Sequence, residues 1–281
     1  MRVLGVDLAW TQRNESGLVA LEPDGTISDA GWAIGTAATV AWIEQNATAD
    51  TLVMVDAPLV VENPAGTQRL CENQTSRQYG RWKAGANSSN LGKPERLAGV
   101  QLRLELERRG FRYDDGLDGP PAGGRVVSEC YPYTTLVGAA ELGYNLERPT
   151  YKRPPRGVSM VAFRPQRALV CDELIRRVGA LRVALPPLDL STHPQTRRLL
   201  EEPSPLPDSA YKHREDLLDA AISAWTGALW LRWGFERCQV LGDGPEVARP
   251  AATIIAPARP EQRAPGWTPA APPGAPRAGV G

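Results

Sequence analysis

The sequence predicts one α/β domain built on a mixed, five-stranded sheet with helices on both faces. Short apolar runs separated by turns occupy the first third of the 281 residues, which is typical of strands. The runs at 2–9 and 51–55 are apolar almost throughout, and such strands belong to sheets covered on both faces. Helical patterns then dominate the rest of the chain, so one mixed α/β sheet is expected.

The strands of this sheet are expected in a simple order along the chain. Glu22-Pro23-Asp24-Gly25 separates the second and third strands and predicts a hairpin, because glycine adopts positive φ without strain. The pattern therefore begins with antiparallel strands, and residues 253–256 could add a final edge strand. The five expected strands are residues 2–9, 17–21, 26–34, 51–55 and 125–130.

Helices are expected after the third strand and throughout the second half of the chain. The segment 94–109 begins with proline and stops at Gly110, which is the usual punctuation of a helix. The domain is expected to span 1–258. Residues 259–281 are rich in proline, alanine and glycine and are expected to be disordered. The expected helices are residues 36–46, 94–109, 132–142, 165–178 and 211–233.

Composition restricts which binding partners and which cellular location are expected. The formal net charge is +0, so any polyanion must bind through a local patch. Four cysteines without a CxxC pair, and only two histidines, argue against structural zinc and favour a reducing cytosol. No signal peptide is expected at the N-terminus, and no apolar run approaches the ~18 residues of a membrane span. We therefore expect a cytoplasmic protein with no membrane partner.

Three acids share one position in the predicted sheet. Asp7, Asp56 and Glu129 each stand at or near the carboxyl end of an expected strand. Sites in open α/β sheets form beyond these ends, and a buried carboxylate is costly unless it is paired or binds a metal. The set predicts a shared cation. The alternative is that these are ordinary strand-end acids that cap turns.

The last expected helix carries two further acids. Asp216 and Asp219 are three residues apart and therefore lie on one helical face, which they share with Lys212. The helix becomes apolar from Ala220 onward, so two like charges stand where it begins to be buried. A divalent cation would relieve their repulsion. The alternative is a solvated first turn in which acids favour the helix dipole.

A basic insert at 63–92 follows Asp56 and is expected to lie beside these acids. Its arginines alternate with Tyr79 and Trp82, and this combination suits a phosphate backbone with stacked bases. A second basic loop, 148–156, could extend the patch, whereas the alternative is an ordinary solvated surface. The residues expected to bind nucleic acid are Arg69, Arg77, Arg81, Lys83 and Lys212.

Five motifs together resemble a known family. Their sequences are Gly5-Val6-Asp7-Leu8-Ala9-Trp10, Val55-Asp56-Ala57-Pro58-Leu59, Arg69-x-Cys71-Glu72, Glu129-Cys130-Tyr131-Pro132 and His213-Arg214-Glu215-Asp216-Leu217-Leu218-Asp219-Ala220. In this order they are similar to domain of unknown function 429, a family described as predicted ribonuclease-H-like nucleases. The late-helix motif also resembles the Holliday-junction resolvase branch of that superfamily. The resemblance covers about residues 2–233 and implies a ribonuclease-H-like fold.

The resemblance implies a metal-dependent nuclease that hydrolyses phosphodiester bonds with two Mg²⁺ or Mn²⁺ ions. Asp7 would bridge both ions, Asp56 would hold the first, and Asp216 or Asp219 would hold the second. Glu129 would be a further catalytic acid. Many relatives carry glutamate where Asp56 stands, and the shorter aspartate side chain leaves the spacing of the ions open.

Two other functions fit the same fold. One is a non-catalytic scaffold or nucleic-acid-binding protein. The other is a phosphotransferase of the actin or hexokinase type, which needs a glycine-bearing phosphate loop after the first strand, and the run 7–11 has no glycine. The sequence leaves open whether the nucleic acid is DNA or RNA, and which oligomeric state the protein adopts.

Overall fold

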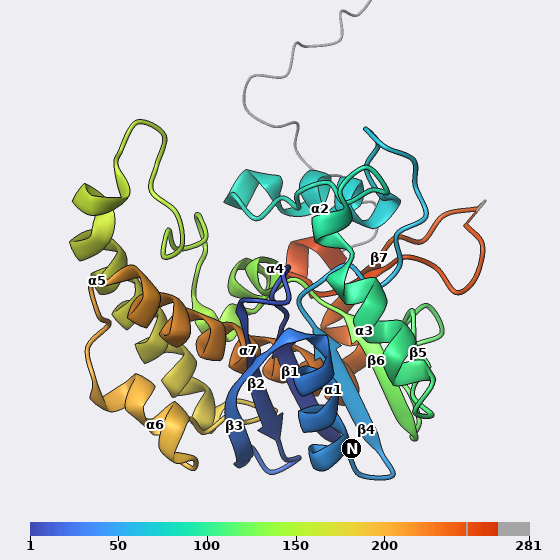
Figure 1. Cartoon of the computed structure of the whole chain (residues 1–281), viewed down its shortest axis with the longest axis horizontal. Helices are drawn as coiled ribbons and strands as arrows, with labels where there is room; N and C mark the ends of the chain where they lie inside the picture. Colours follow the sequence, from blue (N-terminus) through green and yellow to red (C-terminus); the bar gives the residue numbers. More distant parts are fainter. Residues whose placement is uncertain (246, 264–281) are drawn as a thin grey trace, which may run out of the picture.

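A six-stranded mixed sheet forms the centre of the molecule (Figure 1). The computed structural model describes residues 1–245 and 247–263. The strand order is β3-β2-β1-β4-β6-β5. The strand β2 is antiparallel to both of its neighbours, β1 and β3, whereas β4, β6 and β5 run parallel to β1. The strands are β1 (Arg2–Asp7), β2 (Glu15–Leu21), β3 (Ile27–Ile34), β4 (Thr51–Val55), β5 (Arg112–Tyr113) and β6 (Arg125–Glu129). The predicted α/β class with a mixed sheet is confirmed.

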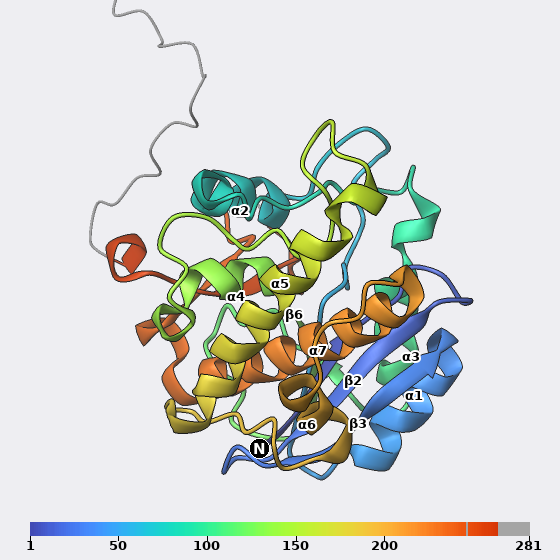
Figure 2. The ribbon, with the colours of Figure 1, turned by 90° about the vertical axis from the view of Figure 1, so that its left-hand side faces the viewer.

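Helices cover both faces of this sheet, as predicted. The helix α7 crosses one face, and α1 and α3 lie on the other (Figures 1 and 2). Alternate residues of β1 divide between two cores, with Val3 on the α7 side and Leu4 and Val6 on the α1 side. The helices are α1 (Gly35–Asn46), α2 (Leu70–Tyr79), α3 (Ala98–Glu107), α4 (Pro132–Gly138), α5 (Met160–Gly179), α6 (Pro194–Glu201) and α7 (Asp208–Trp233). Short 3₁₀ turns occupy Gly80–Trp82, Pro94–Arg96, Ala140–Leu142, Ala180–Val183, Gly234–Glu236 and Pro260–Arg263.

The strand predictions need two corrections. The sheet has six strands instead of five, because the two-residue strand β5 adds to the edge beyond β6. A strand this short has no measurable periodicity in the sequence. The expected edge strand at 253–256 is instead β8 (Ile254–Pro257), which pairs with β7 (Cys238–Leu241) in a separate two-stranded sheet.

Each predicted helix is present at its expected position, but the first or last residue of several differs from the prediction. The helix α5 begins at Met160, five residues before the proline that was expected to open it, because the Ser159 side chain caps the Ala162 amide. The helices α2 and α6 had no counterpart among the expected helices. The hairpin between β2 and β3 forms as predicted, with Gly25 at a φ of 91°.

The first residues of the predicted C-terminal tail form a regular turn. The segment 259–263 was expected to be disordered, but Pro260–Arg263 form a 3₁₀ turn. Arg259 anchors this turn by donating hydrogen bonds to the carbonyls of Val137 and Tyr144. Residues 264–281 of the predicted tail lie outside the described residues. In the described part of the chain, no helix combines the length and apolarity that a membrane crossing requires.

Candidate metal centre

Three of the predicted acids meet at one edge of the sheet, where Asp7 and Asp56 line a large cleft. Asp7 ends β1 and Asp56 follows β4, and these neighbouring parallel strands stop at the same edge of the sheet. Asp219 reaches the same point from α7. One carboxylate oxygen from each of the three residues lies within 4.8 Å of the others. The predicted convergence of Asp7, Asp56 and Asp219 is confirmed, whereas their role as metal ligands remains a prediction.

Two glycines allow α7 to bring its acids this close. A Cβ atom on Gly5 would lie 2.0 Å from the Ala220 carbonyl oxygen, and one on Gly17 would lie 2.0 Å from that of Asp216. Any side chain at either position would push the helix away from the sheet. Gly17 is also the antiparallel partner of Asp7, so the point of closest approach lies beside the first acid. The strands thereby determine where the acids of α7 lie.

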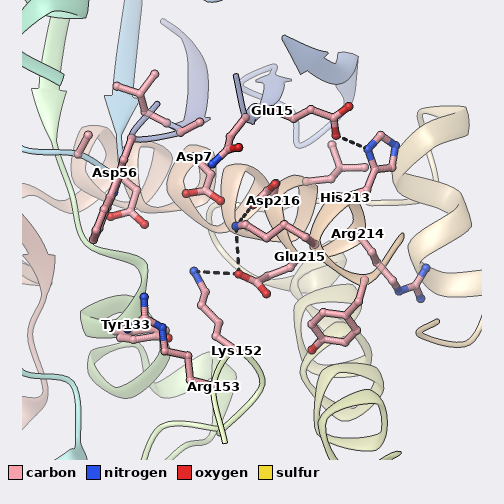
Figure 3. A pocket seen from close by; sticks show the side chains of 18 of the residues that line it. Asp7, Glu15, Asp56, Tyr133, Lys152, Arg153, His213, Arg214, Glu215 and Asp216 are labelled. Carbon is pink, nitrogen blue, oxygen red and sulfur yellow. Dashed lines mark hydrogen bonds and ion pairs between the residues drawn. The ribbon is translucent and has the colours of Figure 1, made fainter. Parts of the chain in front are cut away.

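A fourth predicted acid, Asp216, joins the cluster beside Asp7 (Figure 3). Its carboxylate contacts the Lys212 ammonium, which also lies 3.3 Å from Glu215. A second ammonium, that of Lys152, contacts Asp219 and lies 3.6 Å from Glu215. The cluster therefore contains five carboxylates and two lysines, and its formal charge is negative.

Glu215 and Lys152 were not among the predicted site residues. Glu215 had a usable signal, because it stands three residues after Lys212 and four before Asp219, and therefore shares their helical face. Lys152 had none, because it lies 63 or more residues from every acid in the cluster. Only folding brings its loop onto α7.

Burial and the repulsion of neighbouring carboxylates raise the pKa values of Asp56, Asp216 and Asp219. Asp216 is 2% exposed, and burial followed by the nearby Asp7 raises its pKa to about 9 despite Lys212. Burial also raises the pKa of Asp219 to about 6, with Lys152 opposing the rise. Burial, and then Asp7, raises the pKa of Asp56 well above its usual value. The site thus has a strong tendency to take up positive charge, as protons or as a cation.

Tyrosines hold the loop that carries Lys152 in place. The Tyr151 hydroxyl donates a 2.7 Å hydrogen bond to Asp219, and the Tyr211 hydroxyl donates to the Tyr151 carbonyl at 2.5 Å. Both rings are almost fully buried. Asp219 therefore has a fixed orientation, with one oxygen on the tyrosine and the other on Lys152.

The fifth predicted acid, Glu129, does not join this cluster. It is 3% exposed, and its two carboxylate oxygens accept hydrogen bonds from Arg69 at 2.7 and 2.9 Å and from the Leu59 amide at 2.9 Å. Arg69 also pairs with Glu72 at 2.9 Å and is itself 5% exposed. Glu129 and Arg69 are therefore buried partners of one another that both border the cleft, and their predicted catalytic and nucleic-acid-binding roles remain predictions. The planar guanidinium satisfies both carboxylates at once, which makes the burial of these charges tolerable.

The basic insert also lies differently from the prediction. Its cations Arg77, Arg81 and Lys83 are exposed but are not among the residues that line the cleft. Arg81 lies over the Trp82 ring at 4.7 Å, and Lys83 pairs with Glu147 at 2.8 Å. The insert borders the cleft only through the positions around Gly85–Ser89 and through the buried Arg69–Glu72 pair.

Other cations line the cleft, whose volume is about 1630 Å³. The second basic loop supplies Arg148, Lys152 and Arg153, and Arg13 lies in the loop after β1. The predicted Lys212 also lines the cleft, but its ammonium is engaged by the acids of α7. The basic loop at 148–156 is therefore closer to the acids than the insert at 63–92.

Comparisons with known proteins identify a family. The model of the family described as "Protein of unknown function (DUF429)" matches residues 5–247, so the chain belongs to this family, as its motifs indicated. No curated protein is significantly similar in sequence. Among solved structures, a ROK family protein from Streptococcus pneumoniae TIGR4 in complex with sucrose is 12% identical, over 80% of this chain and 98% of that chain, with a TM-score of 0.24. Similarity at this level supports no statement about fold or activity.

Proposed function

We propose that this DUF429 protein is a nuclease that hydrolyses phosphodiester bonds with divalent cations held by its acid cluster. The observation that carries the proposal is the convergence of Asp7, Asp56 and Asp219, with carboxylate oxygens within 4.8 Å of one another. Carboxylate oxygens are the preferred ligands of Mg²⁺ and Mn²⁺. Five acids against two lysines also leave an excess negative charge that a divalent cation would balance.

The residues of the cluster have distinct roles in this proposal. Asp7 lies between Asp56 and Asp216 (Figure 3), so it would be a ligand on both sides, with Asp56 and Asp219 completing the first site and Asp216 contributing to a second. Bound Mg²⁺ or Mn²⁺ would supply an activated water and charge stabilisation at the phosphate. Lys152 and Lys212 hold Asp219 and Asp216 in place.

The order of the elements supports a ribonuclease-H-like fold. A first strand ending in Asp7, a hairpin of β2 and β3, an acid after β4 and acids on the late helix α7 occur in the order that the resemblance implies. Five carboxylates at one point repel one another and destabilise the fold. A scaffold without activity would have no need to keep such a cluster.

Cleavage of labelled DNA and RNA, single-stranded, double-stranded and branched, with Mg²⁺, Mn²⁺ or EDTA tests the proposal. We expect cleavage with metal and none with EDTA. Asp7→Asn removes one charge and a ligand while it keeps the side-chain shape, so activity should fall at least about 100-fold. Its folding should be intact, and Mn²⁺ should raise its Tm less than that of the wild type.

Asp208→Asn is the matched control, because Asp208 is an exposed aspartate on the same helix, paired with Arg164. It should cleave and respond to Mn²⁺ like the wild type. Equal Mn²⁺ stabilisation of wild type and Asp7→Asn, or no cleavage of any substrate by the wild type, would contradict the proposal. If the wild type cleaves no substrate and Mn²⁺ does not raise its Tm, the protein is a scaffold.

A further inference from the structure

A rigid aromatic pair stands at the rim of the cleft. The rings of Trp32 on β3 and His213 on α7 are stacked, with centroids 3.5 Å apart and an interplanar angle of 16°. The Trp32 indole donates a 2.8 Å hydrogen bond to the His213 carbonyl, and Glu15 lies 2.7 Å from the imidazole Nδ1. Both rings line the cleft, and the His213 side chain is 45% exposed. The pair therefore offers a flat, fixed surface for stacking.

A second aromatic group with cations lies across the acids from this pair. Arg148 lies over the Tyr133 ring at 3.9 Å, and the Lys152 ammonium is 5.3 Å from the same ring. Arg153 is exposed and lines the cleft. Figure 3 shows Tyr133 and Arg153 on one side of the acids and His213 on the other. A strand that crosses the acids would thus meet a ring surface on one side and the cations Arg148 and Arg153 on the other.

Stacking surfaces of this kind select among nucleic acids. In a duplex both faces of each base are covered by its neighbours, whereas an unpaired base can stack on a protein ring. The acids are also recessed, since Asp7 is 9% exposed and Asp219 is fully buried. We propose that the cleft takes an unpaired, single-stranded segment of nucleic acid, with one base stacked on the Trp32–His213 pair and the adjoining phosphates at the acids and at Arg148 and Arg153. This inference rests on the proposed function and names its substrate class.

Charge limits the length of strand that the cleft can hold. Because the whole chain has a formal net charge of +0, binding depends on the cleft cations for which no carboxylate partner is described, such as Arg148 and Arg153. Neutralising two or three phosphates of a single strand gives a log–log salt slope of roughly −1.4 to −2.1, at about −0.7 per phosphate. Each base stacked on a protein ring contributes about 1–3 kcal/mol, or roughly 5- to 150-fold in Kd. Short oligonucleotides should therefore bind with a modest salt dependence.

Binding of the full-length Asp7→Asn variant separates recognition from cleavage. Fluorescence anisotropy with Mg²⁺ would compare a labelled 12-nucleotide single strand, as DNA and as RNA, with the duplex of the same sequence. We expect the single strand to bind at least about 5-fold more tightly than the duplex, since one stacked base accounts for that ratio. Adding Trp32→Leu should weaken single-strand binding about 5- to 150-fold. Trp42→Leu, in α1 outside the cleft, should leave it unchanged.

Two further measurements keep the test decisive if Trp32→Leu affects folding. His213→Ala removes the exposed ring of the pair and should weaken single-strand binding in the same direction. Arg153→Ala should reduce the salt slope by about 0.7, whereas Arg77→Ala, an exposed arginine outside the cleft, should not change it.

The outcomes distinguish this inference from the nuclease proposal. Equal or tighter binding of the duplex, or an unchanged Kd in both ring variants, would overturn the single-strand inference even if the wild type cleaves duplexes with Mn²⁺. Selective single-strand binding that depends on Trp32 and His213, without any cleavage by the wild type, would support the inference and reject the nuclease. Absence of binding to all oligonucleotides would overturn the inference.

Discussion

Two groups of acids occupy equivalent positions in the sheet, yet their surroundings differ. At the end of β6, Glu129 is enclosed with Arg69, and its oxygens accept hydrogen bonds from the guanidinium and from a backbone amide. At the ends of β1 and β4, Asp7 and Asp56 meet the acids of α7 with too few lysines to balance them. Both groups border the same cleft, but Glu129 has a guanidinium partner that binds both of its oxygens, whereas the second group has five carboxylates against two lysines.

The difference shows that a strand-end acid is a weak indicator of function by itself. Burial raises the pKa of Glu129, and the charge and hydrogen bonds of Arg69 oppose that rise. In the acid cluster the nearest charges are mostly other carboxylates, which add to the effect of burial on Asp56 and Asp216. The partner of each acid, more than its place in the sheet, separates a structural ion pair from a candidate metal centre.

The largest expected effect is on the enclosed pair. Arg69→Leu would leave Glu129 buried without a countercharge and should reduce the free energy of unfolding by about 3–5 kcal/mol. Urea denaturation of Arg69→Leu and of Arg77→Leu, an exposed arginine on the neighbouring helix, would measure this loss, and the control should change by less than about 0.5 kcal/mol. Adding Glu129→Leu to Arg69→Leu should recover part of the loss. If Arg69→Leu were as stable as the control, the pair would not be the stabilising element described.

A smaller effect is expected where α7 approaches the sheet. Gly17→Ala places a Cβ against the Asp216 carbonyl and should destabilise the fold by about 1–3 kcal/mol, because the helix must move. Displacement of Asp216 should also weaken Mn²⁺ stabilisation. Gly31→Ala in the adjacent strand β3 is the control, since its Cβ would meet no described atom within 4 Å. Thermal unfolding with and without Mn²⁺ would compare them, and equal Tm values would show that the close approach is not needed.

The smallest effect, taken per pH unit, concerns pH in the absence of metal. Because the folded-state pKa of Asp216 is raised to about 9, the folded protein holds a proton that the unfolded chain releases near pH 4, so stability should fall as pH rises from 5 to 8. The loss is at most about 1.4 kcal/mol per pH unit. Asp216→Asn should reduce this dependence when unfolding is measured in EDTA. Asp208→Asn should not, since the pKa of Asp208 is lowered and its titration lies below this range. An identical pH dependence in Asp216→Asn and wild type would contradict the assignment.

Much of the fold was predictable because its signals are local. The apolar runs of β1 and β4, the Pro23-Asp24-Gly25 turn and the helical pattern of α7 are each contained within one short segment. The two-residue strand β5 and the pairing of β8 with β7 were missed, because each depends on contacts between distant segments. Propensity carries no information about such pairings.

The candidate site likewise contains residues that local sequence patterns predict and residues that only folding brings together. Asp7, Asp56, Asp216 and Asp219 could be predicted from strand ends and helical spacing. The insert at 63–92 was expected beside them because it follows Asp56 in sequence, yet its exposed cations lie outside the cleft. Proximity in sequence did not determine which basic loop faces the acids.

The sequence by itself determined the α/β class, the family and the acids that end β1 and β4, because alternation, spacing and motif order are properties of consecutive residues. Only the tertiary structure decided that Arg69 neutralises Glu129, that Lys152 reaches Asp219, and that His213 stacks on Trp32. Each of these pairs joins residues 60 or more positions apart. The charge of a site depends on such long-range partners, and the packing of α7 on the sheet and of the loops over α7 selects them.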